Sequence, residues 1–69
     1  MNFLESGIVK VSACGIFAKP TFKSEMVNQV LEGEEVKIIH KEGRWFQVSL
    51  VFDGYKGWIH EMYLESFNG

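Results

Sequence analysis

Cysteine, basic charge and long apolar runs are all scarce in this sequence of 69 residues. The single cysteine, Cys14, cannot form an internal disulfide, so the fold is not a disulfide framework. A net charge of −2 argues against nucleic acid as a partner, because nucleic-acid-binding domains present a basic face. No apolar run is long enough to span a membrane, and no cluster of lysine and arginine would attract an anionic membrane surface.

An export signal is also missing, since no charged start is followed by a long apolar run. If Met1 is the natural start, we expect a cytoplasmic protein; the cell envelope would follow instead if an export signal has been removed. The length fits one small domain, residues 1–69. A chain this short buries only about 60% of its unfolded surface, so we expect a stability margin of roughly 3–5 kcal/mol.

The most informative stretch is a pair of apolar runs, Trp45–Phe52 and Tyr55–His60, joined by Asp53-Gly54. Asp-Gly between two β-prone runs predicts a tight hairpin, because glycine takes a positive φ without steric cost. Side chains alternate between the two faces of a strand, which puts Trp45 and Trp58 on the more polar face. A tryptophan there is either a lid over one end of the domain or part of a binding surface.

Short strands separated by turn residues account for most of the chain. They are expected at Ile8–Val11, Met26–Leu31, Glu35–Lys41, Arg44–Leu50 and Tyr55–His60. Ala13–Ser24 is interpreted as a long irregular loop with Ile16 turned inward, because Pro20 cannot donate to a central ladder. Glu61–Leu64 is too short for an α-helix and predicts one 3₁₀ turn. The pattern indicates an all-β fold, a small five-stranded barrel or sandwich, with Val11, Val36, Ile38, Val48 and Ile59 buried.

Cys14 is the residue to test as a nucleophile, because a catalytic cysteine needs a histidine in reach and a third group that orients it. His40 and His60 are present, but neither stands at a catalytic spacing from Cys14. The three side chains are also too scattered to suggest a metal site, and the glycines are isolated rather than gathered in a phosphate-binding loop. The sequence therefore predicts a non-enzymatic domain without metal or cofactor, in which Cys14 is a small buried residue.

Several motifs resemble the bacterial SH3 (SH3b) domain. Its turn glycine with V-x-V/I, its W-x-x-V strand and its G-W-V/I strand match Gly33–Ile39, Trp45–Val48 and Gly57–Ile59. Two further segments, Ser24–Glu34 and Phe52–Trp58, resemble one subgroup of the family, the N-terminal SH3b module of NlpC/P60 cysteine peptidases. The resemblance covers about residues 8–64 and implies a small SH3-like barrel with a long first loop and a terminal 3₁₀ turn.

In that subgroup the SH3b module is not catalytic; it assists a peptidase domain that acts on cell-wall peptides. The resemblance therefore implies two partners, a C-terminal NlpC/P60 catalytic domain in cis and a cell-wall (peptidoglycan) peptide. It implies that Glu25 and Tyr55 reach the active site of the peptidase, where they meet the free amino end of the substrate. It places Trp45, Trp58 and Tyr63 on the aromatic groove of SH3 domains.

Alternatives stay open at this point. Phe17 stands where the family has an arginine, which puts any ion pair of that arginine in doubt. Glu25 can also be an ordinary exposed acid, and Tyr55 a residue that packs on a turn. The domain can equally be a free-standing SH3-like module that binds peptide or glycan through its aromatic residues, or a spacer that only stabilises its neighbours.

Overall fold

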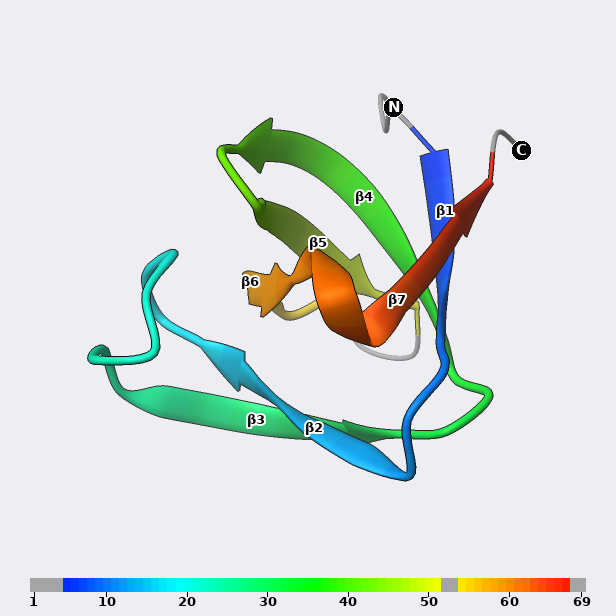
Figure 1. The fold of residues 1–69 in the computed structure, drawn as a ribbon, viewed down its shortest axis with the longest axis horizontal. Helices are drawn as coiled ribbons and strands as arrows, with labels where there is room; N and C mark the ends of the chain where they lie inside the picture. Colours follow the sequence, from blue (N-terminus) through cyan, green and yellow to red (C-terminus); the bar gives the residue numbers. More distant parts are fainter. Residues whose placement is uncertain (1–4, 52–53, 68–69) are drawn as a thin grey trace.

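The strands of the computed structural model form one antiparallel sheet, described over residues 5–51 and 54–67 (Figure 1). The described residues contain seven strands: β1 (Glu5–Val9), β2 (Ala13–Phe17), β3 (Met26–Leu31), β4 (Glu35–Glu42), β5 (Trp45–Leu50), β6 (Lys56–His60) and β7 (Leu64–Phe67). A 3₁₀ turn, η1 (Glu61–Tyr63), joins β6 to β7 and confirms the turn expected there. Within the described residues, no helix is long and apolar enough to cross a membrane.

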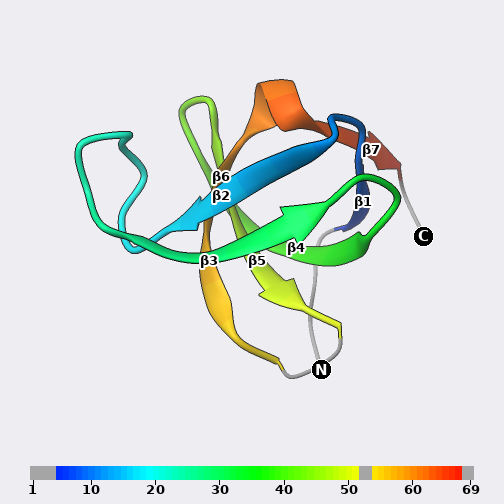
Figure 2. The same ribbon diagram turned by 90° about the horizontal axis from the view of Figure 1, so that it is seen from below.

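The strand order is β3-β2-β6-β5-β4-β1-β7, and every neighbouring pair is antiparallel. Figure 2 shows how strongly the sheet curls, with β2 and β3 crossing over β5 and β6. The ladder is nevertheless open, because β3 and β7 form its two edges. The all-β prediction is confirmed, whereas closure into a barrel stays a prediction.

Two strands were missed by the sequence analysis, so the count is seven where five were expected. β2 lies inside the segment interpreted as loop; it is short, but it pairs with β3 along its whole length. β7 follows η1 and pairs with β1 from Ser6 to Val9. The first strand also lies earlier than expected, at Glu5–Val9, because its partners in β4 and β7 fix it there.

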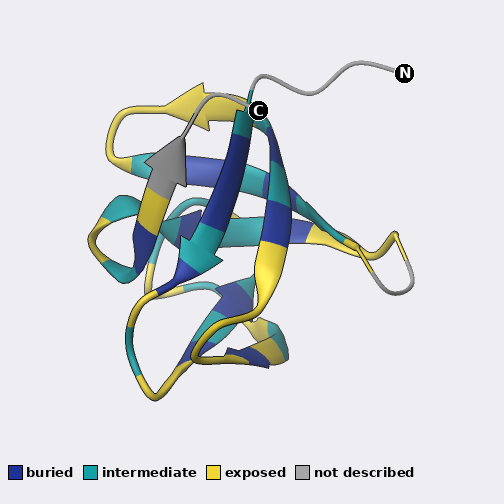
Figure 3. Ribbon diagram, turned by 90° about the vertical axis from the view of Figure 1, so that its right-hand side faces the viewer, coloured by how far each residue is buried: buried dark blue, intermediate teal, exposed yellow. Residues whose placement is uncertain are grey.

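The core lies inside the curl of the sheet, where β2, β4, β5 and β6 show buried positions alternating with more exposed ones (Figure 3). It consists of Val9, Cys14, Ile16, Val30, Val36, Ile38, Phe46, Val48, Ile59 and Leu64. The prediction of a buried Ile16 is confirmed, as are those for Val36, Ile38, Val48 and Ile59. The prediction for Val11 is wrong: Val11 lies beyond the end of β1 and is only half-buried, and Val9 takes the core position.

The predicted β5–β6 hairpin forms, but β5 ends at Leu50 and β6 begins at Lys56, so the connection is longer than a two-residue Asp53-Gly54 turn. Gly54 has a φ of +72°, a value that glycine adopts without a Cβ clash. Its N–H donates to the carbonyl of Leu50 at 2.8 Å, and the N–H of Leu50 donates to the carbonyl of Tyr55 at 2.9 Å. Phe52 and Asp53, the other residues of this turn, lie outside the described residues.

Candidate functional site

Five rings from five elements of the chain gather on the outer face of the sheet. We call this group the aromatic face; its members are Phe17 of β2, Phe22 of the β2–β3 loop, Trp45 of β5, His60 of β6 and Tyr63 of η1. Phe22 contacts all the others: its ring centroid lies 4.7 Å from that of Trp45 and 5.5 Å from that of His60. Its distances to Phe17 and Tyr63 are 5.6 and 6.4 Å.

Strand register brings the inner part of this face together. Trp45 is directly opposite His60 in the β5–β6 ladder, and their ring centroids are 5.1 Å apart. Both side chains point away from the core because Phe46 and Ile59, the adjacent residues, are buried. The predicted outward parity of Trp45 is therefore confirmed, and Trp45 itself is half-buried under its aromatic neighbours.

Ser24 holds Phe22 in place by closing the β2–β3 loop. Its hydroxyl donates to the carbonyl of Thr21 at 2.8 Å and contacts the backbone of Lys19 through both its carbonyl and its N–H. The N–H of Ser24 also donates to the carbonyl of Thr21 at 3.1 Å. The loop is thus tied to itself at its base, so Phe22 is a fixed part of the face although its side chain is 49% exposed.

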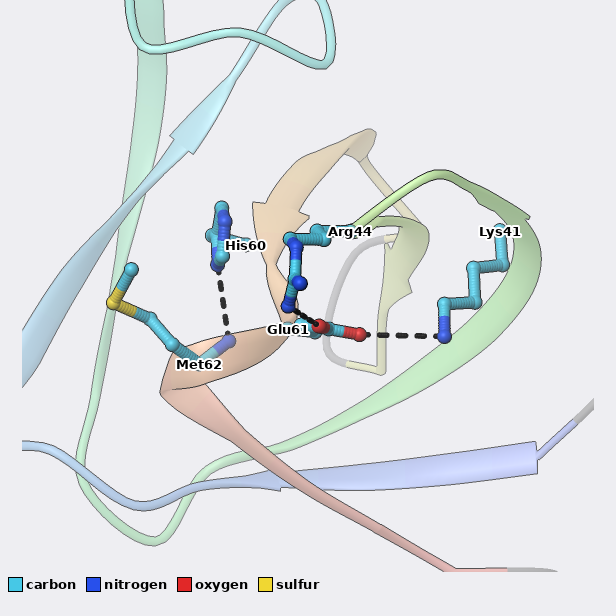
Figure 4. A network of polar contacts seen from close by, with 5 residues as sticks. All are labelled: Lys41, Arg44, His60, Glu61 and Met62. Atoms are coloured by element: carbon cyan, nitrogen blue, oxygen red, sulfur yellow. Dashed lines mark hydrogen bonds and ion pairs between the residues drawn. The ribbon is translucent and has the colours of Figure 1, made fainter.

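His60 ends β6 and caps the 3₁₀ turn. Its Nδ1 accepts a hydrogen bond from the N–H of Met62 at 3.1 Å (Figure 4). This bond satisfies a backbone donor that a turn of this length leaves without a partner. The same side chain therefore anchors η1, which carries Tyr63, and contributes a ring to the aromatic face.

Glu61 ties η1 to the β4–β5 turn on the other side of His60. Its carboxylate contacts Lys41 Nζ at 3.3 Å and Arg44 Nη1 at 3.2 Å, as drawn in Figure 4. Its N–H donates to the carbonyl of Arg44 at 2.9 Å. The hydrogen bond from Lys41, helped by the charge of Arg44, holds the pKa of Glu61 below its usual range.

Trp58 points to the same side of β6 as His60 and is the ladder partner of Phe17 on β2, so its predicted place on the same surface stays a prediction. It points outward from β6, as its parity predicts, but it lies opposite Gln47 rather than beside Trp45. Its ring contacts that of His40, with centroids 6.0 Å apart. Trp45 and Tyr63 are thus brought together through Phe22 and His60, while Trp58 adjoins the group through its ladder partner Phe17 and makes its ring contact with His40.

Glu25 and Tyr55, the two residues singled out by resemblance, lie on different hairpins. Glu25 directly precedes β3, and its carbonyl accepts from the N–H of Ala18 at 2.8 Å. It lines a hollow of about 380 Å³ in the β2–β3 loop, together with Ala18, Lys19, Thr21, Lys23 and Ser24. Tyr55 directly precedes β6 and is exposed. It is not among the lining residues of that hollow, so a joint role with Glu25 stays a prediction.

Cys14 is buried in the core, as expected for a small apolar residue. Burial, and to a smaller extent the charge of Glu34, raises the pKa of its thiol, which disfavours the nucleophilic thiolate. Within residues 5–51 and 54–67, no group of three or more His, Cys, Asp or Glu side chains is placed to hold a metal ion.

Comparison with known families decides the class of the domain. Residues 16–64 match the family described as the bacterial dipeptidyl-peptidase SH3 domain. The chain belongs to this family. No curated protein matches the chain. SH3 domains are a family of non-catalytic modules.

Three members of the aromatic face were not found from the sequence: Phe17, Phe22 and His60. The sequence drew attention to Phe17 only because the family has an arginine at this position. In the structure its ring contacts that of Trp45, with centroids 5.8 Å apart. Phe22 lay in a predicted loop without a period. The sequence did show Phe22 between Thr21 and Ser24, in a loop long enough to fold back over the sheet. In the structure Ser24 closes this loop on Thr21, and Phe22 is exposed.

Proposed function

We propose that this SH3 domain is a non-catalytic accessory module that binds cell-wall peptides and positions them for an NlpC/P60-type peptidase domain in the same protein. The observation that supports this most is the aromatic face on a domain of the bacterial dipeptidyl-peptidase SH3 family. Rigid aromatic rings give a peptide a large contact area at little cost in conformational entropy. In an SH3-like barrel, this face would form one wall of the cleft of the peptidase.

Glu25 would read the free amino end of the peptide. It lies at the end of the β2–β3 loop, the loop that also carries Phe22, and lines the hollow there. A carboxylate that meets an ammonium makes a charge-assisted hydrogen bond, and a blocked amine would leave that carboxylate without its partner. Tyr55 would contribute a second contact from the β5–β6 hairpin.

The proposal is tested in the parent peptidase with Glu25→Gln. We expect this variant to lower kcat/KM for L-Ala-γ-D-Glu-diaminopimelate by about 10–100-fold, the range for a hydrogen bond to a charged group. Acetylation of the substrate amine should harm the wild type far more than it harms Glu25→Gln. Equal losses in the two enzymes would show that Glu25 does not read the amine.

The domain alone should not cleave this peptide, because its cysteine is buried and burial raises the pKa of its thiol. Incubation of the chain with L-Ala-γ-D-Glu-diaminopimelate, followed by mass spectrometry, should show no free diamino acid. Turnover that Cys14→Ser abolishes would contradict the non-catalytic role.

A second candidate is a free-standing module that binds peptide or glycan. It is favoured by the aromatic face, all of whose members lie within this one chain. The gene sequence beyond Gly69 distinguishes the two: a following domain with a cysteine and later histidines favours the accessory role, and a stop codon favours the free-standing one.

A further inference from the structure

His60 presents a hydrogen-bond donor whose position is set by the backbone. Its Nδ1 accepts the N–H of Met62 at 3.1 Å and therefore cannot carry a proton while this bond is made. A neutral imidazole has a single ring proton, so that proton lies on Nε2. Nε2 is on the other side of the ring from Met62 (Figure 4), and no oxygen among residues 5–51 and 54–67 accepts from it.

The ring that carries this donor cannot turn freely. Phe22 stacks on it with an interplanar angle of 15°, and Trp45 meets it edge-on at 76°. Tyr63 lies on a further side, with centroids 6.3 Å apart. A donor held in one orientation loses little conformational freedom when a ligand binds, which makes its hydrogen bond more favourable.

Charge around the aromatic face differs in sign from that of the chain as a whole. The segments that surround the face (residues 18–25, 41–44 and 60–63) carry the cations Lys19, Lys23, Lys41 and Arg44 and the acids Glu25, Glu42 and Glu61. They bear one net positive charge, whereas the whole chain has a net charge of −2. Glu61 is already paired with Lys41 and Arg44, and the two lysines Lys19 and Lys23 outnumber the one acid, Glu25, that lines the same hollow of the loop that carries Phe22.

We propose that the Nε2–H of His60 donates to a carboxylate of a peptide that lies across the aromatic face, with Lys19 and Lys23 supplying the attraction of charge. This rests on the proposed function and names the feature of the peptide that the face reads. A hydrogen bond from a neutral imidazole to a carboxylate is stronger than one to an uncharged carbonyl, because the acceptor is ionised. The domain therefore distinguishes acidic peptides from their amidated forms.

Two substitutions of His60 separate the role of its Nε2–H as a donor from the role of its Nδ1 as the cap of η1. In His60→Asn, the side-chain oxygen takes the place of Nδ1 and can still accept from Met62, but nothing replaces Nε2–H. In His60→Gln, the amide N–H₂ reaches the place of Nε2, and the cap is lost. Both variants lose the ring, so the change in stacking on Phe22 is matched. His40→Asn, at the other histidine, is the control for the substitution itself.

The measurement is an NMR titration of the ¹⁵N-labelled chain at about pH 8, where imidazoles are neutral. The probes are L-Ala-γ-D-Glu-diaminopimelate with free carboxylates and the same peptide with carboxamides in their place. We expect His60→Asn to weaken binding of the acidic peptide by about tenfold, as for the loss of one hydrogen bond to a charged group, and His60→Gln to keep most of it. The amidated peptide should bind the wild type about tenfold more weakly and be insensitive to His60→Asn.

The outcomes separate this inference from the proposed function. If the wild type binds both peptides equally, the face binds cell-wall peptides but His60 reads no carboxylate, and the inference is overturned alone. Equal binding of the acidic peptide by wild type and His60→Asn overturns it as well, as does a ring proton found on Nδ1 in the ¹⁵N spectrum of the free chain. If neither peptide shifts any resonance of the face, both proposals fail.

Discussion

The ring of Phe22 lies nearly parallel to the imidazole of His60, with centroids 5.5 Å apart and an interplanar angle of 15°. This contact joins the β2–β3 loop to the end of β6 and so links two segments far apart in sequence. Phe22 covers the inner rings while half of its own side chain faces solvent. It is therefore the most exposed ring of the aromatic face.

Phe22→Ala should weaken peptide binding strongly while reducing stability only slightly. Aromatic pairs contribute about 0.5–1.5 kcal/mol beyond the area they bury, and Phe22 is half exposed, so we expect a loss near the lower limit. Tryptophan fluorescence should change because Trp45 loses its neighbour. Leu31→Ala, at another exposed apolar residue, is the control. Unchanged peptide binding in Phe22→Ala would remove Phe22 from the site.

Val48→Ala should destabilise the domain by about 2–3 kcal/mol, the usual range for truncating a buried aliphatic side chain. Val48 is fully buried in the core, whereas Val51, three positions along, is 55% exposed. Val51→Ala makes the same chemical change at the surface and should leave the thermal unfolding curve almost unchanged. Equal losses in the two variants would contradict the burial of Val48 in the core.

Gly57→Ala should be more disruptive than its small size suggests. A Cβ at this position would overlap the Cγ2 of Ile16 and lie 3.2 Å from the carbonyl oxygen of Phe17. Ile16→Leu removes the branched methyl group, so the double variant should regain part of the stability that Gly57→Ala loses. Chemical denaturation of the four proteins measures this coupling, and strict additivity of the two changes would contradict it.

Glu61 should make the stability of the domain depend on pH. The pKa of Glu61 is lowered in the folded state from an ordinary value of 4.5, mainly by its hydrogen bond from Lys41. The ionised form thus stabilises the fold above that value, and this contribution is lost as pH falls through the folded pKa. Melting temperatures of wild type and Glu61→Gln should differ at neutral pH and converge in acid. Glu65→Gln, at an exposed carboxylate of β7, should show a smaller difference, and added salt should reduce the effect of Glu61.

Cys14 should react slowly with thiol reagents in the folded domain. Burial raises the pKa of its thiol above the ordinary value of 9.0, so little thiolate forms at moderate pH, and the sulfur is covered by the core. Labelling with a disulfide reagent at about pH 8 should be far slower than for a free thiol and should become fast in denaturant. Fast labelling without denaturant would mean that Cys14 is accessible.

Much of the sheet follows from local patterns in the sequence. Alternation placed Val36, Ile38 and Val48 correctly in the core, and Gly54 marked the β5–β6 turn. β2 was harder to find because Gly15 interrupts it and the segment leads into a proline-containing loop. Its strand character depends on contacts distant in sequence: Gly15 leaves room for the side chain of Met26 on β3.

The aromatic face was predictable only in part. The alternation of side chains along a strand tells which face of the sheet a residue occupies, but not which residues of other strands lie beside it. Trp45 and Trp58 were both correctly placed outward, yet the ladder puts Trp45 opposite His60 and Trp58 opposite Gln47. Phe22 owes its position to the hydroxyl of Ser24, which closes the loop through hydrogen bonds that no period in the sequence reveals.

The pairing of β1 with β7 determines how the domain responds to mechanical force. Ser6 is opposite Phe67 and Val9 is opposite Leu64, so the beginning of β1 and the end of β7 lie at the same end of the pair. Hydrogen bonds of an antiparallel pair run perpendicular to the strands. Tension applied at Ser6 and Phe67 would therefore break these hydrogen bonds one after another from that end of the pair, instead of loading all of them together in shear. The β1–β7 pair would give way at low force and would leave β2 to β6, which carry the larger part of the core, still paired.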